Sequence, residues 1–355
     1  MYLLLHCLLT FSPTVPPPME HAPSQDTTVD SAVRRRVVEA AAARFSEGYV
    51  FPQAGERARA RLRARLAQGA YDRFVHGDSL AAALTADLQA ATGDRHAGVF
   101  FNPVARPATE WERPTAEALE QVRRGQAFSN FAFKKVERLD GNVGYVRVDL
   151  FLPPAVAGET LASAMTFLAN TDALIIDLRN NRGGEPAAVA LMASYLVGPE
   201  PVQLSGLVTR NGKEVQSWTS PFVPGARFAG RDVFVLTSGR TASAAEALAY
   251  DLQALGRARV VGEKTAGAAN PGGTVRIDER FVVFVPTERA LSPITRSNWE
   301  GLGVTPDIPV PAEAAQQTAY VAALRAALQR DPSGDYSGLI RGALEAAERA
   351  VPAVR

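Results

Sequence analysis

The segment TSGRTASAAEALAYDL, residues 237–252, contains a serine where a buried strand is expected to turn into a helix. The run VFVLT at 233–237 is typical of a strand buried on both faces, and an Ala-rich helical stretch begins near Ser243. A hydroxyl there lies beside the free N–H groups of a helix N-terminus, which can stabilise an oxyanion. The pattern is compatible with a serine nucleophile. However, Ser243 and Glu246 also match the capping box Ser-x-x-Glu, which has a purely structural explanation.

The segment DLRNNRGGEP, residues 177–186, follows a second buried strand, ALIIDL at 173–178. Paired glycines after a parallel strand allow the backbone to approach a ligand and to present N–H groups to it. The same pair before a helix also occurs in an ordinary turn. The segment has neither Gly-Lys-Ser/Thr nor G-x-G-x-x-G, so we expect no nucleotide cofactor here.

The segment GDRHAGVFF, residues 93–101, places His96 at the junction between a helical region and a strand-rich region. Clefts commonly form at such junctions, so His96 is a candidate base, although an exposed structural histidine has the same pattern. His76, in FVHGD, reads more simply as a helix-end residue.

Hydrophobic periodicity divides the chain into a helical first part and an α/β second part. Val33, Val37, Ala41 and Phe45 repeat at four-residue spacing, as do Leu80, Leu84 and Leu88 after Asp78, a plausible N-cap. Beyond His96, short apolar runs alternate with Gly-containing loops and Ala-rich stretches, at 185–196 and 243–255. This order predicts parallel βαβ units. The segment 275–286 adds strand, and 312–350 is expected to be helical.

Composition argues against several classes of function. Lys+Arg (38) and Asp+Glu (37) nearly balance, so nothing in the charge favours a nucleic-acid partner. The single cysteine, Cys7, excludes an intrachain disulfide and a cysteine zinc site. With four histidines, two of them in the Pro-rich N-terminal stretch, we expect no metal centre and no cofactor.

The N-terminal segment, residues 1–29, is expected to be a disordered leader or a degenerate export signal. Its apolar run YLLLHCLL lacks a basic start, and Met19 could be the true initiator, so both an exported and a cytoplasmic location stay open. No later segment has the roughly 18 apolar residues of a membrane span, and we expect none.

Several motifs in order resemble the S41 peptidase family of tail-specific proteases: DLRNNRGG, TASAAE, VVGEKTAG and NWEGLGVTPDI. EGYVFP at 47–52 and GNVGYVRVDLF further resemble its interphotoreceptor retinoid-binding-protein-like branch. The resemblance implies an α/β fold: a small N-terminal helical domain (30–95), then a ClpP/crotonase-like ββα core with a mixed sheet (96–320). A C-terminal helical tail (321–355) follows, and no PDZ module is expected.

The resemblance also implies a role for each matching position. Ser243 matches the family nucleophile, and the amides of Ala244 and of Gly183 or Gly184 match its oxyanion hole. In the tricorn-like branch a histidine acts as base and a carboxylate orients it, and His96 and Glu300 stand at those positions. A neutral imidazole within hydrogen-bond reach is what a serine hydroxyl needs to become a good nucleophile.

The chain departs from the family pattern at several positions. The lysine base of the processing-protease branch is replaced by Ala268, and Lys264 lies four residues too early. Arg95 replaces a hydroxyl residue that bridges to the carboxylate in the tricorn-like branch. Asn270 stands where many relatives of the retinoid-binding branch carry histidine.

Three functions remain open from the sequence. The first is a serine peptidase that cleaves extended or unfolded peptides, with a peptide or protein as its partner. The second is a non-catalytic binding module for retinoids, fatty acids or similar apolar ligands, and the third is a hydrolase of small esters. The presence of nucleophile, base and oxyanion loop together favours an enzyme. The oligomeric state is open.

Overall fold

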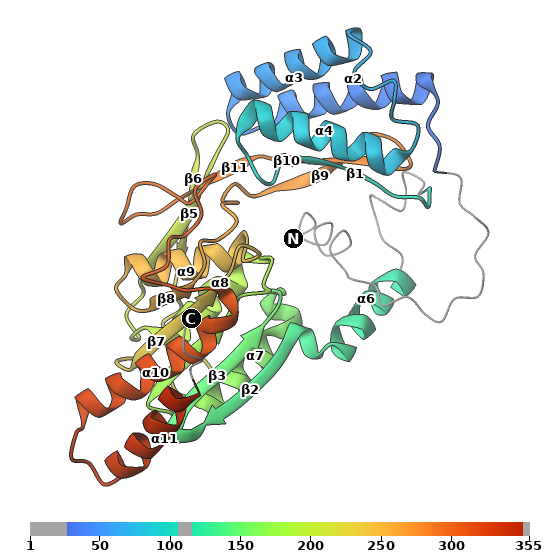
Figure 1. Ribbon diagram of the computed structural model, residues 1–355. Helices are drawn as coiled ribbons and strands as arrows, with labels where there is room; N and C mark the ends of the chain where they lie inside the picture. The colour runs from blue at the N-terminus through green and yellow to red at the C-terminus, as the bar shows by residue number, and fades with distance from the viewer. Residues whose placement is uncertain (1–26, 106–115, 351–355) are drawn as a thin grey trace, which may run out of the picture. The chain divides into compact units, whose positions relative to one another are not determined.

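The computed structural model describes residues 27–105 and 116–350 (Figure 1). Most of the expected leader, and the C-terminal end of the expected tail, therefore lie outside the described residues. The chain divides into two compact units. The first runs up to Arg123 and adds Leu207–Val215 and Asn270–Ala290. The second comprises Arg124–Gly206, Gln216–Ala269 and the chain from Leu291 onward.

This division differs from the contiguous domains expected from the sequence. The first unit extends past the helical region because a late hairpin, within residues 270–290, returns to pair with the strand that follows His96. The expected boundary at residue 320 falls inside a single helix, α10 (Ala312–Arg330).

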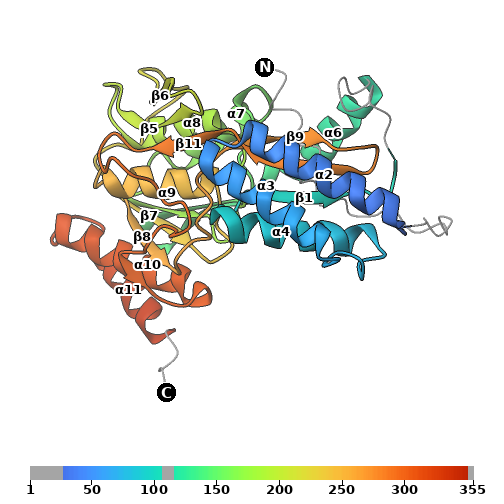
Figure 2. The ribbon, with the colours of Figure 1, turned by 90° about the horizontal axis from the view of Figure 1, so that it is seen from above.

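The first unit begins with three helices: α2 (Ser31–Gly48), α3 (Pro52–Ala67) and α4 (Gly77–Thr92). They lie side by side in Figure 2. Asp30 caps α2, since its carboxylate accepts a hydrogen bond from the Val33 N–H at 2.7 Å. Asp78, expected as the cap of α4, instead lies in its first turn, which suits a negative charge.

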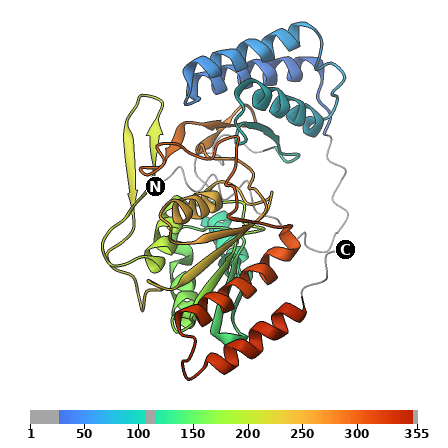
Figure 3. The ribbon, with the colours of Figure 1, turned by 60° about the vertical axis from the view of Figure 1, so that its left-hand side comes forward.

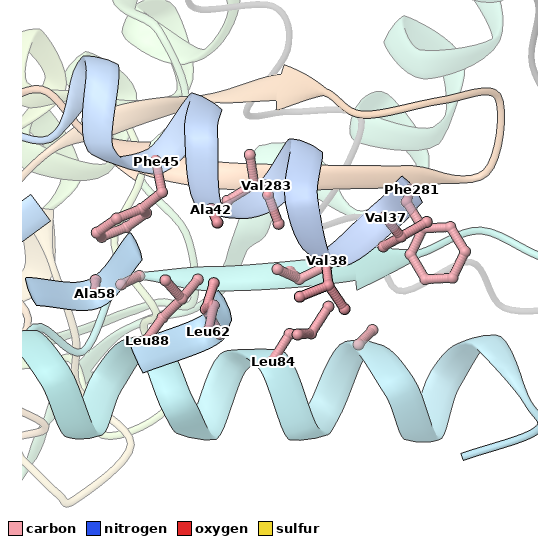
Figure 4. Packing of buried hydrophobic residues seen from close by; sticks show 14 of the residues in the cluster. Val37, Val38, Ala42, Phe45, Ala58, Leu62, Leu84, Leu88, Phe281 and Val283 are labelled. Atoms are coloured by element: carbon pink, nitrogen blue, oxygen red, sulfur yellow. The ribbon is translucent and has the colours of Figure 1, made fainter. Parts of the chain in front are cut away.

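The helices pack against a three-stranded antiparallel sheet, order β1-β10-β9. Its strands are β1 (Gly98–Phe101), β9 (Gly272–Arg276) and β10 (Phe281–Pro286). Figure 4 shows Val37, Phe45, Leu84 and Val283 in the shared core, where each is fully buried. The segment 275–286 is a hairpin rather than one strand, because the Asp278 carboxylate accepts the N–H groups of Arg280 and Phe281 and fixes a turn.

A six-stranded mixed sheet forms the centre of the second unit, in the order β12-β8-β7-β4-β3-β2. The strands β2 and β3 are antiparallel and the others are parallel, which confirms the α/β class with a mixed sheet. The strands are β2 (Phe133–Leu139), β3 (Val143–Val148), β4 (Ala173–Asp177), β7 (Asp232–Thr237), β8 (Arg259–Gly262) and β12 (Ile308–Pro309). A separate small sheet has the order β11-β5-β6, with β5 (Gln203–Thr209), β6 (Glu214–Trp218) and β11 (Glu288–Leu291).

Both faces of the central sheet are covered, as the continuous apolar runs predict. Ile175 and Phe234 pack with Ala319 of α10 on one face. The neighbouring residues Leu174 and Ile176 are equally buried and point the opposite way, as successive strand residues must.

The helices of the second unit precede or follow the strands in βαβ order. They are α7 (Pro154–Leu168), α8 (Pro186–Leu196), α9 (Ala244–Ala254), α10 and α11 (Ser337–Arg349). A further helix, α6 (Ala116–Phe128), begins in the first unit, ends in the second and precedes β2. Helices α10 and α11, drawn in red, form an antiparallel pair in Figure 3. Within the described ranges, no helix combines the length and the apolar character that a membrane span needs.

Candidate active site

Three loops of the second unit leave neighbouring parallel strands at the same edge of the sheet. Phe151 follows β3, Gly183 and Gly184 follow β4, and Ser243 follows β7, and these strands pair in that order. The carboxyl ends of parallel strands are the usual place for a ligand in such sheets. The arrangement brings together four of the six site residues expected from sequence, because Ala244 directly follows Ser243.

Ser243 begins α9 in a strained conformation. Its backbone angles are φ 55° and ψ −124°, whereas an ordinary N-cap residue has extended angles. The capping box expected from sequence is present, and the Glu246 carboxylate accepts the Ser243 N–H at 2.8 Å. A cap alone does not require positive φ. Strain of about 1–3 kcal/mol at such a residue persists only where the surroundings impose it, and it is concentrated at functional sites.

The two glycines after β4 are required by close approach. Gly183 has φ 110°, and a Cβ there would lie 2.6 Å from the Ser243 Cβ and 3.0 Å from the Ala244 nitrogen. At Gly184, with φ 120°, a Cβ would lie 2.1 Å from the Phe151 carbonyl oxygen. The glycine loop therefore lies directly against Ser243, and only residues without a side chain fit there.

Asn181 holds this loop in place. Its Oδ1 accepts the Gly183 N–H at 2.8 Å, and its Nδ2 donates to the Val148 carbonyl at 3.0 Å. Its own carbonyl accepts the Ala242 N–H at 3.1 Å. Asn181 is fully buried. Its side-chain amide links the end of β3 to the glycine loop, and its backbone carbonyl adds the segment before Ser243.

The hydrogen bonds distinguish the two candidate glycine amides. The N–H of Gly183 already donates to Asn181, whereas the N–H groups of Gly184 and Ala244 have no partner within the described residues. The Ala244 amide is free because the first N–H groups of a helix have no intrahelical acceptor. Gly184 and Ala244 are thus the pair that can still donate to an incoming oxygen.

Glu246 is a fully buried carboxylate that joins Ser243 to the next loop. Besides the Ser243 amide, it accepts the Ala268 N–H at 2.9 Å, the Gly267 N–H at 2.7 Å and the Thr265 hydroxyl at 2.5 Å. Burial raises the pKa of Glu246, and these four donors oppose that rise.

The same loop is fixed from its other end by Glu300. Its Oε2 accepts the Ala269 N–H at 2.6 Å, so three consecutive amides, 267–269, donate to two carboxylates. The neighbouring Trp299 donates its indole N–H to the Ala268 carbonyl at 3.0 Å. Ala268, where the resemblance in sequence would place a lysine, is thus a buried alanine within a firmly held loop.

His96 belongs to the first unit, between α4 and β1. Its backbone N–H donates to Asp94 at 2.9 Å, and its ring stacks on Phe284 with centroids 5.8 Å apart. The other oxygen of Asp94, which is buried, accepts the Tyr49 hydroxyl at 3.1 Å and the Asn270 amide at 2.9 Å. The interaction of His96 with Ser243 and Glu300 stays a prediction.

The environment of His96 favours a neutral imidazole. Burial lowers the pKa of His96 below its usual value, and the nearby Asp94 carboxylate partly opposes this. Its Nδ1 is buried and has no hydrogen-bond partner in the described part of the chain. Around neutral pH the ring is therefore uncharged, as a general base must be.

Asn181, Glu246 and Asp94 were not assigned to the site from sequence. In the sequence, Glu246 is half of a capping box, and Asn181 and Asp94 lie within DLRNNRGGEP and GDRHAGVFF. The signal that could identify such site residues is a polar residue, buried in the fold, within a loop that flanks the candidate glycines. Their partners are distant in sequence, as with Asp94 and Asn270, so only the fold reveals them.

Two sequence profiles match the chain. Residues 142–310 match peptidase family S41, and residues 28–134 match the N-terminal domain of peptidase S41 in eukaryotic IRBP. The matches cover most of the second unit and the helical first unit, in the order expected from the motifs. The chain belongs to peptidase family S41.

Among curated proteins, the chain resembles carboxyl-terminal-processing proteases. It is 29% identical over 194 residues to that of Picosynechococcus sp., which covers 54% of this chain and 45% of the relative. It is 30% identical over 196 residues to that of Synechocystis sp., covering 55% and 40%. The chain therefore spans less than half the length of these relatives.

A solved structure shares the fold over nearly its whole length. A lipoprotein from Streptococcus agalactiae superposes with a TM-score of 0.51 at 14% identity, covering 82% of this chain and 96% of that one. At this identity the likeness concerns the fold alone.

Proposed function

We propose that the protein is a serine-type peptidase that forms an acyl-enzyme on Ser243. The observation that carries the proposal is the strained start of α9, where Ser243 has φ 55° and the glycine loop lies against it. Membership of peptidase family S41 supports the same chemistry.

In this proposal, the Gly184 and Ala244 amides form the oxyanion hole. When the Ser243 Oγ attacks a peptide carbonyl, the carbonyl oxygen becomes an anion, and preorganised N–H donors stabilise it. Loss of one such donor typically costs about 10²–10³-fold in rate. The role of Gly183 is then to bring its neighbour's amide beside Ser243, since its own N–H is held by Asn181.

We assign the general base to His96 and its orientation to Glu300. His96 takes the proton from Ser243 Oγ during attack and gives it to the departing amine, and the carbonyl carbon stays bonded to Oγ. Water then attacks the ester while His96 takes its proton. The bond between the carbonyl carbon and Oγ breaks, His96 returns the proton to Ser243 Oγ, and the acid is released. The lowered pKa of His96 and the absence of a lysine at Ala268 both favour this assignment.

The proposed substrate is a peptide or protein in an extended or unfolded state. The names of the curated relatives describe proteases that process carboxyl termini, and we extend only the peptidase chemistry to this chain. The two other functions left open by the sequence are less favoured. A carrier of apolar ligands has no need of a strained serine beside two free amides.

The test is hydrolysis of a pool of unstructured peptides and small acyl esters, read by mass spectrometry, with Ser243→Ala and His96→Ala as controls. Peptide turnover lost in both variants supports the mechanism with its base. Turnover lost only in Ser243→Ala contradicts the role of His96 and directs attention to Lys264. Turnover of esters alone would identify an esterase. No turnover in the wild type would contradict the proposal and favour a binding module.

A further inference from the structure

Three exposed cations lie at the edge of the central sheet where Ser243 is found. Arg182 belongs to the glycine loop after β4, Arg240 to the loop after β7 and Lys264 to the loop after β8. These strands are parallel neighbours in the sheet, so the three loops leave it at the same edge. Arg182 stands two residues before Gly184, and Arg240 three residues before Ser243. The cations are therefore close in the chain to the proposed nucleophile and its free amides.

Backbone hydrogen bonds join the three loops. The Asn181 carbonyl accepts the Ala242 N–H at 3.1 Å, which connects the loops after β4 and β7. The Thr241 carbonyl accepts the Ala266 N–H at 3.0 Å, which connects the loops after β7 and β8. Each of these four residues lies within two positions of one of the cations. Because arginine and lysine side chains are long, all three cations can reach the same bound group.

The fold makes no use of these three cations. Arg179, in the same loop as Arg182, donates to both oxygens of the buried Asp177, at 2.9 and 2.6 Å, and to the Ala312 carbonyl at 2.7 Å. By contrast, no salt bridge or side-chain hydrogen bond joins Arg182, or either of the other two cations, to another described residue. One arginine of this loop thus holds the structure together, and the other is free to bind a ligand.

The acidic side chains nearest to the cations along these loops are bound to backbone amides. Glu263 accepts the Gly239 N–H at 3.2 Å and the Ala312 N–H at 3.3 Å. Glu185 caps α8 by accepting the Ala187 N–H at 3.4 Å. These carboxylates lower the net charge of the edge, but neither of them pairs with a cation. The donors of the three cations therefore remain available.

We propose that Arg182, Arg240 and Lys264 bind an acidic side chain of the substrate close to the cleaved bond. The inference rests on the proposed peptidase function and adds to it a substrate class, peptides with Asp or Glu near that bond. A carboxylate suits these groups because the planar guanidinium fork can donate two parallel hydrogen bonds to it. Charges placed around a binding site contribute to the choice of partner and to its rate of association.

The test compares kcat/KM for peptides with acetylated and amidated ends that differ only in one residue near the cleaved bond: Glu, Gln or Lys. The wild type is expected to favour Glu over Lys by about tenfold or more, with Gln between them, because each cation attracts one and repels the other. The preference should decrease in about 1 M salt, where the Debye length falls to about 3 Å.

Reversal of one charge should reverse part of this preference. Arg240→Glu is expected to lower the ratio of kcat/KM for Glu over Lys by about tenfold and to improve cleavage of the Lys peptide. Arg182→Glu and Lys264→Glu should act in the same direction. A folding defect would instead lower all three peptides together. Arg138→Glu is the matched control: this exposed cation in β2 pairs with Gly144 near the start of β3, at the other edge of the sheet, and its change should leave the ratio unaltered.

Three results would overturn the assignment while the peptidase function stands. They are equal cleavage of the Glu, Gln and Lys peptides, a preference that appears only with a free C-terminal carboxylate, and an equal change of the ratio in the Arg138→Glu and Arg240→Glu variants. If the wild type cleaves no peptide of any charge, the proposed function itself fails, and this inference fails with it.

Discussion

Helices α8 and α9 begin in the same setting but in different ways. Each follows a buried parallel strand and a Gly-containing loop, and each has an acidic residue at its start. Glu185 caps α8 with ordinary extended angles, φ −83° and ψ 122°. Ser243 caps α9 at φ 55° and ψ −124°. A helix can therefore start at this edge of the sheet without strain, and the strain at Ser243 needs an explanation other than capping.

The surroundings explain how the strain is maintained. Ser243 is held by Glu246 from inside its own helix, and Gly183 lies against its Cβ. At α8, the cap is a long hydrogen bond of 3.4 Å, which the Ala187 N–H donates to the Glu185 carboxylate.

Gly183→Ala should remove nearly all activity, by about 10²–10³-fold, because its methyl group would displace Ser243 or the Ala244 amide. Steady-state kinetics on a cleaved peptide measure this. Gly239→Ala is the matched control in a neighbouring loop, since nothing lies within 4 Å of its Cβ position. Near-normal activity in Gly183→Ala would mean that the glycine loop does not shape the site.

Glu246→Gln should lower the free energy of unfolding by about 3 kcal/mol. Four donors converge on its two oxygens, and an amide keeps only one oxygen, so at least one buried N–H loses its acceptor. Denaturant unfolding measures the change. Glu263→Gln is the control: this exposed residue also accepts two amides, and its loss should cost less than about 1 kcal/mol. Equal effects would contradict the special role of Glu246.

Asp251→Asn should stabilise the protein above pH 6. Burial raises the pKa of Asp251 to about 6, and among the described residues Ser205 alone donates to its carboxylate, through its N–H and its hydroxyl. A folded-state pKa about two units above the unfolded value makes the ionised group cost about 3 kcal/mol at high pH, and this cost fades as pH falls toward 4. The variant's advantage should therefore grow between pH 4 and pH 7 in thermal unfolding. A pH-independent difference would contradict the argument.

Ser243→Gly should raise the free energy of unfolding by about 1–2 kcal/mol while it abolishes activity, because glycine adopts positive φ without strain. The matched change at α8, Glu185→Gly, relieves no strain and should slightly destabilise the protein. If the two substitutions shift the unfolding midpoint in the same direction, the contrast between the two helix starts has no energetic basis.

Much of the fold could be predicted from the sequence because it depends on local periodicity. ALIIDL and VFVLT became β4 and β7, and the Ala-rich stretches after them became α8 and α9. The four-residue spacing of Val37, Ala41 and Phe45 gave a buried helix face. The strand content of 275–286 is confirmed, and its division into β9 and β10 depends on a turn fixed by the Asp278 carboxylate.

The site was only partly predictable. Ser-x-x-Glu has the same sequence whether it caps a helix or holds a nucleophile, and the difference is a backbone angle imposed by Gly183 from another loop. The choice between Gly183 and Gly184 depends on Asn181, which engages only one of their amides. Such features follow from contacts between distant segments rather than from any single motif.

The most direct test of the central claim is labelling with a fluorophosphonate probe, followed by mass-spectrometric mapping of the modified peptide. The probe reacts only with an activated serine. We predict one adduct, on Ser243, in the folded protein, and none after heat denaturation or in Ser243→Ala. An adduct on another residue, or an unlabelled Ser243 in protein that still cleaves peptides, would contradict the assignment of Ser243 as the nucleophile.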